Sequence, residues 1–100
     1  MSGIFPSLEW LHTFENKLNS DEHYAQIAKN WEGDMYFVIE PEGNLKEQMV
    51  MYLDLWHGEC RRVEIVDDIA KYNPAFSLKL YSVFDLPKNL QFRQTIRKLH

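Results

Sequence analysis

The clearest alternation of apolar and polar positions runs from Gln48 to Val66, and it predicts two β-strands that fold back on each other. Successive side chains of a strand point to opposite faces, so strict alternation is typical of a half-buried strand. The residues expected on one face of the first strand are Met49, Met51, Leu53 and Leu55, and those on the other are Val50, Tyr52, Asp54 and Trp56. This stretch therefore predicts the central β-hairpin of the protein.

The turn of this hairpin sets the predicted register. Gly58 supplies the left-handed backbone position that such a turn usually needs. With a three-residue loop over residues 56–58, the expected partners are Met51 with Val63, Met49 with Ile65, and Asp54 diagonal to Arg62. We expect Asp54 to pair with Arg61 or Arg62 across the hairpin.

Two helices are predicted before the hairpin. The first runs from about Leu8 to Leu18 with Ser7 as its N-cap. Its apolar residues at helical spacing are Leu11, Phe14 and Leu18. The second is capped by Ser20, and Gly33 ends it as a left-handed cap. The apolar stripe of this second helix consists of Tyr24, Ile27, Ala28 and Trp31.

Two further strands complete the predicted fold. Asp34–Glu40 and Ala75–Tyr81 are rich in β-forming residues, and one helical turn is expected at Asp68–Lys71. The fold class is α+β, with two N-terminal helices packed on a mostly antiparallel sheet of four strands. Pro87 favours a short C-terminal helix, whose apolar spacing is less regular.

One face of this sheet must be covered by the helices. The apolar residues expected on it are Phe37, Met49, Met51, Leu53, Val63, Ile65, Phe76 and Leu78, and those expected to cover it are Leu11, Phe14, Leu18, Ile27 and Trp31. Burial of each large side chain contributes roughly 1.5–3 kcal/mol, so this layer is the main source of stability. It is either an ordinary core or, where it encloses a void, the lining of an apolar tunnel. Methionines suit a tunnel because thioethers adapt to variable shapes.

Length, charge and cysteine usage narrow the class of protein. One hundred residues fit one domain, and the single cysteine, Cys60, fits a reducing compartment. The start carries no secretion signal, and no apolar run has membrane-spanning length, so we expect a cytoplasmic protein. Residues 1–84 carry seven basic and fourteen acidic side chains, which argues against nucleic acid as a partner. Residues 85–100 carry four basic side chains and one acidic, a tail that is solvated or makes at most peripheral membrane contact.

Candidate catalytic residues are few. His57 and Cys60 are three residues apart around the turn, as in a nucleophile pair or half a metal site. The further ligands of a metal site and the orienting group of a catalytic dyad have no recognisable spacing. We therefore expect a turn residue and a buried thiol, and no enzyme, metal or cofactor.

Three segments resemble the sterol carrier protein type 2 family, in its branch of small stand-alone prokaryotic proteins. They are Trp31–Asp34, Phe37–Gly43 and Tyr52–Cys60, of which the last, YLDLWHGEC, is the most specific. The resemblance runs from about Ile4 to Tyr81. It implies a mostly antiparallel five-stranded sheet covered by helices, with an apolar tunnel for fatty acyl chains, sterols or other lipids.

The chain departs from that family after Ser82. The family continues with two helices and a final strand, whereas this sequence continues as VFDLPKNLQFRQTIRKLH. We expect residues 1–82 to form an incomplete lipid-binding domain and residues 83–100 a divergent basic tail. The tail is either natural divergence or the product of a reading-frame change.

Two functions follow from this comparison. The first is a non-catalytic carrier that holds an acyl or isoprenoid chain between sheet and helices. The resemblance and the apolar pattern assign its lining to Phe14, Phe37, Met49, Met51, Leu53, Val63, Ile65, Phe76 and Leu78. The alternative is an interaction or structural module that forms a homodimer through an uncovered sheet edge.

Overall fold

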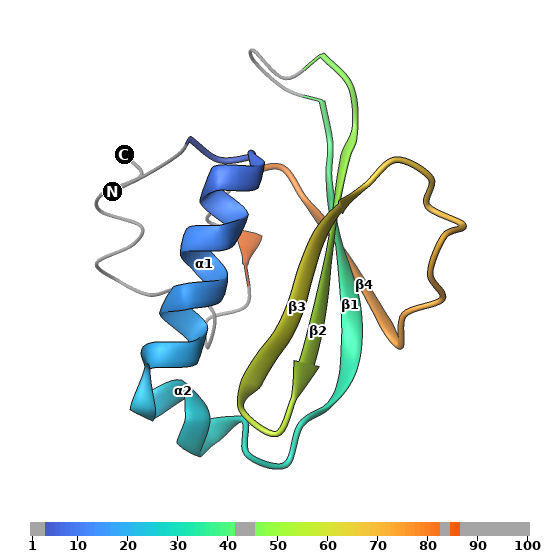
Figure 1. The fold of residues 1–100 in the computed structure, drawn as a ribbon. Coiled ribbons are helices and arrows are strands. Elements are labelled where there is room, and N and C mark those ends of the chain that lie inside the picture. The colour runs from blue at the N-terminus through green and yellow to red at the C-terminus, as the bar shows by residue number, and fades with distance from the viewer. Residues whose placement is uncertain (1–3, 42–45, 83–84, 87–100) are drawn as a thin grey trace.

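Two helices and a four-stranded sheet make up the fold (Figure 1). The computed structural model describes residues 4–41, 46–82 and 85–86. The elements are α1 (Leu8–Ser20), α2 (Glu22–Ile27), β1 (Glu32–Ile39), β2 (Met49–Trp56), β3 (Glu59–Val66) and β4 (Phe76–Leu80). The predicted α+β class is confirmed, while the C-terminal helix expected from Pro87 lies outside the described residues.

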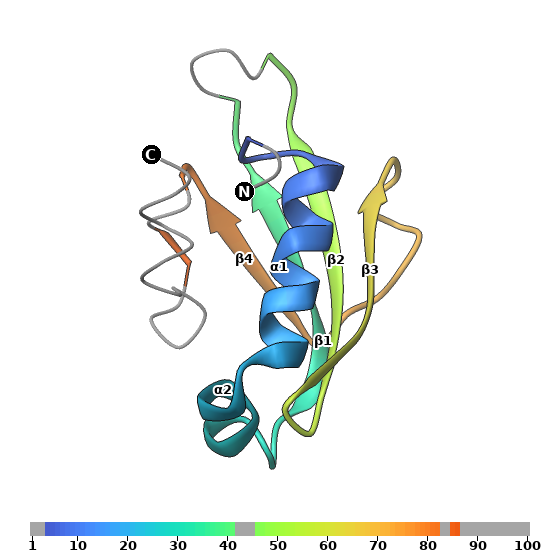
Figure 2. The ribbon, with the colours of Figure 1, turned by 60° about the vertical axis from the view of Figure 1, so that its left-hand side comes forward.

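The sheet has the strand order β3-β2-β1-β4 and mixed directions. β2 is antiparallel to both β1 and β3, whereas β4 is parallel to β1. The chain therefore leaves the sheet after β3 and returns at the opposite edge. Figures 1 and 2 show α1 lying against one face of the sheet, with α2 below it. Neither described helix has the length and apolar character needed to cross a membrane.

Short polar side chains cap the N-termini of both helices. Ser7 Oγ accepts a hydrogen bond from the backbone N–H of Trp10 at 3.1 Å, which confirms Ser7 as the N-cap of α1. α1 continues through Ser20, so the cap of α2 is Asp21 and not Ser20. Asp21 Oδ1 accepts from the N–H of Tyr24 at 2.8 Å.

The predicted second helix is too long. α2 ends at Ile27, Trp31 lies outside it, and Gly33 is a residue of β1 and not a left-handed cap. Residues Glu32 and Gly33 pair with the end of β2, and this long-range pairing overrides the helical spacing of the local sequence. Ile27 is 51% exposed and Trp31 is 38% exposed, so neither belongs to the buried core as expected, although the Trp31 ring contacts Phe76 of β4.

The hairpin is present, but its predicted register is wrong. Its turn has two residues, His57 and Gly58, with φ of 52° and 79°. The observed partners are Trp56 with Glu59, Leu55 with Cys60, Asp54 with Arg62, Leu53 with Val63 and Met51 with Ile65. A β-bulge between the pairs Leu55–Cys60 and Asp54–Arg62 inserts one extra residue, Arg61, into β3. Because side chains alternate in a strand, the extra residue lets Cys60, Val63 and Ile65 share one face.

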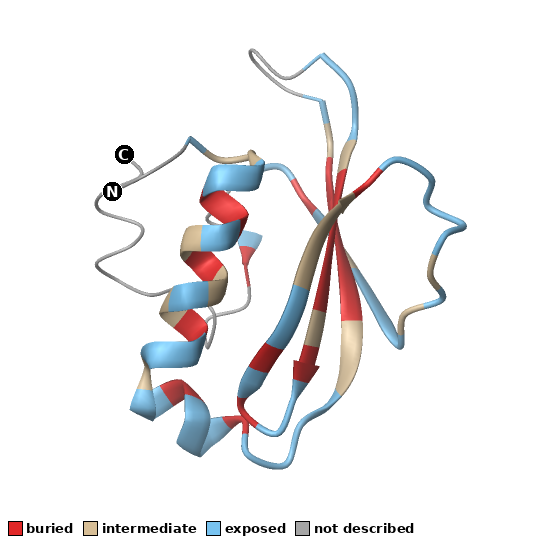
Figure 3. Cartoon of the chain, in the orientation of Figure 1, coloured by how far each residue is buried: buried red, intermediate tan, exposed pale blue. Residues whose placement is uncertain are grey.

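Each face of the sheet carries its own apolar cluster. The helix-facing core contains Trp10, Leu11, Phe14, Leu18, Tyr24, Ala28, Met35, Phe37, Ile39, Met51, Leu53, Leu55, Cys60, Leu80 and Leu86. The far face carries Tyr36, Val38, Val50, Tyr52 and Val66, with Tyr72 from the connection before β4 packed on them. Figure 3 shows buried residues along the sheet and the inner side of α1. The residue lists drawn from the sequence contain part of the first cluster, namely Leu11, Phe14, Leu18, Phe37, Met51 and Leu53, and they missed the second.

Candidate functional site

The predicted lining residues fall into three groups on the helix-facing side of the sheet. Phe14 on α1 and Phe37, Met51 and Leu53 on the sheet are fully buried between the helix and the sheet. Met49, Val63, Ile65 and Leu78 are half-buried and pack against that core. Phe76 is 45% exposed and lies beside Trp31, with ring centroids 4.8 Å apart. The structure thus brings eight of the nine residues into one layer and places Phe76 at its margin.

A cavity of about 670 Å³ opens where β2 begins and β3 ends. Its lining residues are Lys46, Glu47, Gln48, Met49, Val50, Ile65, Val66 and Asp67. Met49 and Ile65 belong both to this lining and to the margin of the helix-facing core. The cavity is open to solvent and is lined by equal numbers of apolar and polar side chains. Val50 and Val66 of this lining belong to the far-face cluster, so the cavity lies at the end of the sheet and touches both faces.

Trp10 is a residue of this layer that the sequence pattern placed beside the apolar stripe of the first helix and did not assign to the core. Its ring stacks on Phe14 with centroids 4.9 Å apart, and Phe5 meets it edge-on at 4.7 Å. The indole is 1% exposed, yet its Nε1–H has no hydrogen-bond partner among the described residues. An unpartnered buried donor costs about 1–3 kcal/mol, so this one requires an explanation.

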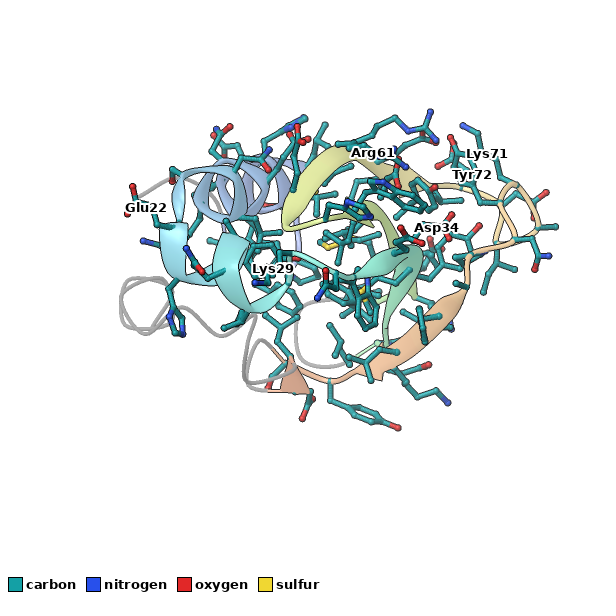
Figure 4. The ribbon with its side chains drawn as sticks, turned by 90° about the horizontal axis from the view of Figure 1, so that it is seen from below. Glu22, Lys29, Asp34, Arg61, Lys71 and Tyr72 are labelled. Carbon is teal, nitrogen blue, oxygen red and sulfur yellow. The ribbon has the colours of Figure 1, made fainter. Side chains whose placement is uncertain are left out.

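A polar network occupies the far face of the sheet. The Tyr36 hydroxyl contacts backbone atoms of Ile69 and Tyr72 at 3.0–3.2 Å. The Tyr72 hydroxyl donates to Glu64 at 3.0 Å, and Lys71 donates to the same carboxylate at 2.5 Å. Figure 4 shows Asp34, Lys71 and Tyr72 on the side of the molecule away from Glu22 of α2. These contacts fix the connection between β3 and β4 and have a structural role.

Asp34 of β1 joins β2 to the segment before β4 on this face. Its two carboxylate oxygens accept hydrogen bonds from the Tyr52 hydroxyl at 2.7 Å and the Ala75 backbone N–H at 2.9 Å. Burial raises the pKa of Asp34, but these two hydrogen bonds outweigh it and the net pKa is lowered. Burial, with the hydrogen bond to Asp34, raises the pKa of Tyr52 to about 12. At neutral pH the pair is therefore a carboxylate and a neutral phenol.

The expected pairing of Asp54 across the hairpin is confirmed. Arg61 donates two hydrogen bonds to the Asp54 carboxylate, at 3.0 and 3.2 Å. Its guanidinium lies 4.8 Å from the centroid of the Trp56 ring. Arg62, the other candidate, lies over Tyr52 and Tyr72 at 5.3 and 5.0 Å. The contacts of Arg61 stabilise the hairpin, and Arg62 joins the hairpin to Tyr72 in the connection before β4.

His57 and Cys60 engage separate partners. His57 Nε2 lies 2.5 Å from Glu32 Oε2, on the surface of the hairpin turn. The Cys60 thiol is buried and donates weakly to the backbone oxygen of Arg62 at 3.8 Å. Burial, with the negative charge of Glu15, raises the pKa of Cys60 to about 12, so the thiolate is not populated at neutral pH. Within the described residues, no group of three or more potential ligands surrounds a metal position.

Asn19 was also missed, and it joins α1 to the sheet. Its side-chain amide donates to the backbone oxygen of Cys60 at 2.9 Å and accepts from the Cys60 N–H at 2.7 Å. The two residues are 41 positions apart, so no local signal in the sequence points to this contact. It satisfies backbone groups on the edge strand β3 and holds α1 over the helix-facing core.

Comparison with solved structures gives this arrangement a context. A crystal structure of sterol carrier protein 2 matches 70% of this chain with 29% sequence identity and a TM-score of 0.59. The solution structure of TT1886 from Thermus thermophilus, a conserved hypothetical protein described as possibly a sterol carrier protein, matches 79% with 28% identity and a TM-score of 0.64. The chain has a sterol carrier protein 2-like fold. This confirms the resemblance seen in its sequence.

The likeness to these structures is partial. The matched part spans 54% of the sterol carrier protein 2 chain and 56% of the TT1886 chain. No protein-family model and no curated protein matches the sequence. The structural comparison therefore establishes the sterol carrier protein 2-like fold. It does not establish that this chain has the activity of the full-length proteins that it resembles.

Proposed function

We propose that this protein is a non-catalytic lipid-binding carrier. A single acyl, isoprenoid or sterol-like molecule lies between the sheet and α1 and leaves through the cavity bordered by Met49 and Ile65. One observation carries the proposal: a chain with a sterol carrier protein 2-like fold has a cavity of about 670 Å³ at the margin of its helix-facing core. Both structural neighbours bear names that refer to a sterol carrier, one of them as a possibility.

The mechanism is burial of apolar surface with no covalent step. Transfer of an apolar chain from water is worth about 0.8 kcal/mol per CH₂ group, so a long chain supplies its own driving force. Met49, Val63, Ile65 and Leu78 are only half-buried and have surface left to cover. In this proposal residues 1–82 form the lipid-binding unit, residues 83–100 form a basic tail, and the protein acts in the cytoplasm.

Binding of a fluorescent fatty acid tests the proposal, with Ile65→Asp as the test variant. Ile65 is half-buried at the cavity, so a carboxylate there is tolerated by the fold but opposes an apolar ligand. We expect affinity to fall about tenfold or more, since an apolar side-chain contact worth at least about 1.5 kcal/mol is replaced by a charge.

Ile69→Asp is the matched control for this experiment. It introduces the same change four positions away, at a side chain that is 53% exposed in the connection before β4. The control should bind the probe like the wild type. Absence of saturable binding by the wild type, or an equal loss in both variants, would contradict the carrier.

A homodimeric interaction module is the second candidate function. Among the described residues, β4 is an edge of the sheet, and the exposed side chains of Phe76 and Tyr81 lie at its two ends. Unpaired backbone groups on an edge strand invite pairing with another chain, and a twofold dimer closes such an interface. A molecular mass in solution that equals the mass of one chain, even at high protein concentration, would contradict the homodimer.

A further inference from the structure

The outer edge of β4 carries backbone groups that no described strand pairs with. β4 is parallel to β1, and Leu80 O accepts a hydrogen bond from the Glu40 N–H at 2.9 Å. Successive residues of a strand direct their N–H and C=O groups to opposite edges, so Ser77 and Lys79, which alternate with Leu80, direct theirs away from β1. The open side of β4 is visible in Figure 2.

This run of outward groups is bounded at both ends. The Ala75 N–H, which is next in the alternation on one side, donates to Asp34 Oδ1 at 2.9 Å. The Tyr81 N–H, next on the other side, donates to Asp85 Oδ2 at 2.7 Å. Both donors are therefore already satisfied, and another strand can pair fully with β4 only over residues 77–79.

The outward groups are symmetric about Leu78. An antiparallel second copy of β4, related by a twofold axis at Leu78, places Ser77 of each copy opposite Lys79 of the other. Each such pair exchanges both of its N–H···O=C bonds, so every outward group of residues 77–79 in both copies is satisfied. A shift of two residues in either direction instead sets Ala75 or Tyr81, whose donors are engaged, opposite one of these residues.

The side chains fit the same axis. Leu78 is half-buried and Phe76 is exposed, both at the margin of the helix-facing core. In this register Leu78 meets its own copy and Phe76 borders Leu80 of the second copy, so apolar side chains face each other across the strands. A lysine on an edge strand usually opposes pairing. Here Lys79 Nζ lies 3.7 Å from Glu40 Oε1 of its own chain, and Lys79 stands opposite an uncharged serine.

We propose that two copies of this chain join their β4 strands antiparallel about Leu78, so that the two sheets become one continuous sheet. This assignment rests on the second candidate function, the homodimer, and specifies its interface and register. The paired run is short, and small interfaces are typical of weak complexes, so the dimer should form in a concentration-dependent way.

Disulfide trapping tests the register. The two Leu78 residues at the axis form a non-hydrogen-bonded pair with Cα atoms about 4.5 Å apart, which a disulfide can span. Leu78→Cys should therefore give a covalent dimer on mild oxidation. Ser77→Cys and Lys79→Cys are matched controls on the same strand. Their thiols lie diagonal to their own copies, on Cα atoms about 7–8 Å apart, and should not be trapped. The wild type, whose Cys60 is buried, is the blank.

Sedimentation equilibrium of the protein without added cysteines tests the backbone pairing. Ser77→Pro removes an outward N–H and no bond to β1, a change that an edge strand tolerates. We expect it to raise the dissociation constant of the dimer at least about tenfold, because half of the interstrand hydrogen bonds are lost. Ser77→Ala retains the N–H and should leave the dissociation constant unchanged. The trapping series does not depend on the stability of Ser77→Pro.

The outcomes separate this interface from the homodimer itself. A wild type that stays monomeric at high concentration, with no covalent dimer in any cysteine variant, contradicts both. A dimer that Ser77→Pro does not weaken, and that Leu78→Cys does not trap, overturns the β4 interface while the homodimer stands. Trapping through Ser77→Cys or Lys79→Cys in place of Leu78→Cys overturns the register.

Discussion

Asp34 shows how a single carboxylate ties two distant parts of the chain together. One oxygen accepts from Tyr52 on the neighbouring strand and the other from the backbone of Ala75, just before β4. The Tyr52 hydroxyl is partly buried, so the loss of its acceptor would be costly, while the bond from Ala75 holds the chain where it returns into the sheet. The stability of the far face therefore depends on the charge state of this residue.

Asp34→Ala should lower the free energy of unfolding by about 1–3 kcal/mol at neutral pH, because two hydrogen bonds to a charged acceptor are lost. The pKa of Asp34 is lowered in the folded protein from its ordinary value of 3.8. Its stabilisation is thus complete above that value and is lost as pH falls through the lower, native pKa. Urea denaturation over a pH series measures this.

Asp67→Ala, which removes the same charge from an exposed position after β3, is the control for Asp34→Ala. It should change stability little at any pH. A stability difference between wild type and Asp34→Ala that persists unchanged in acid would contradict the role given to the carboxylate.

Single residues were predictable only where their partners are near in sequence. The pairing of Asp54 with Arg61 spans seven positions of one hairpin, and the register of a hairpin can be approximated from its turn. The contacts of Asn19 with Cys60 and of Asp34 with Ala75 each span 41 positions. Such contacts depend on how helix and sheet dock, which no local pattern contains.

At the scale of elements, the β2–β3 hairpin is the best-specified part of the protein. Its alternation predicted both strands, yet not the bulge that lets Cys60 and Val63 share a face. Gly58 has a second constraint besides its φ of 79°: a Cβ there would lie 2.7 Å from the backbone oxygen of Ala25. The turn therefore packs directly against α2. Both its backbone conformation and this close contact disfavour a side chain at position 58.

Gly58→Ala should destabilise the protein by about 1–2 kcal/mol from backbone strain, plus the cost of displacing α2. Gly33→Ala is the matched comparison, because Gly33 lies within β1 and its added Cβ would meet chiefly the half-exposed ring of Phe76. Thermal or chemical denaturation of both variants should give a clearly larger loss for Gly58→Ala. Equal losses of stability in the two variants would show that the close contact between α2 and the turn does not contribute to stability.

The second helix shows where pattern-based prediction fails. Ile27 and Trp31 have the spacing of a buried helical stripe, but both are substantially exposed and the helix stops before Trp31. Strand pairing begins at Glu32, opposite Trp56, and the chain must turn before it. A six-residue helix has little intrinsic stability, so its end is decided by the neighbouring sheet.

At the scale of the whole molecule, the layer between sheet and helices is only partly closed. α1 and the core residues bury the middle of the sheet, while Met49, Val63, Ile65 and Leu78 remain half-buried at its margins. The alternation of the strands predicted that Met51 and Leu53 face the helices, but it did not predict that Cys60 does so. Where that face opens was not predictable, because the cavity depends on the spatial relation of residues 46–50 and 65–67.

Native mass spectrometry of gently purified, full-length protein tests the central claim most directly, because it reports bound ligand and subunit number together. The carrier account predicts a population with one lipid-sized mass per chain, released on activation and identifiable as an apolar molecule. A bare chain that gains no mass after incubation with long-chain alcohols, sterols or fatty acids would contradict the account. Should the bare chain also be a stable dimer, the interaction module would take its place.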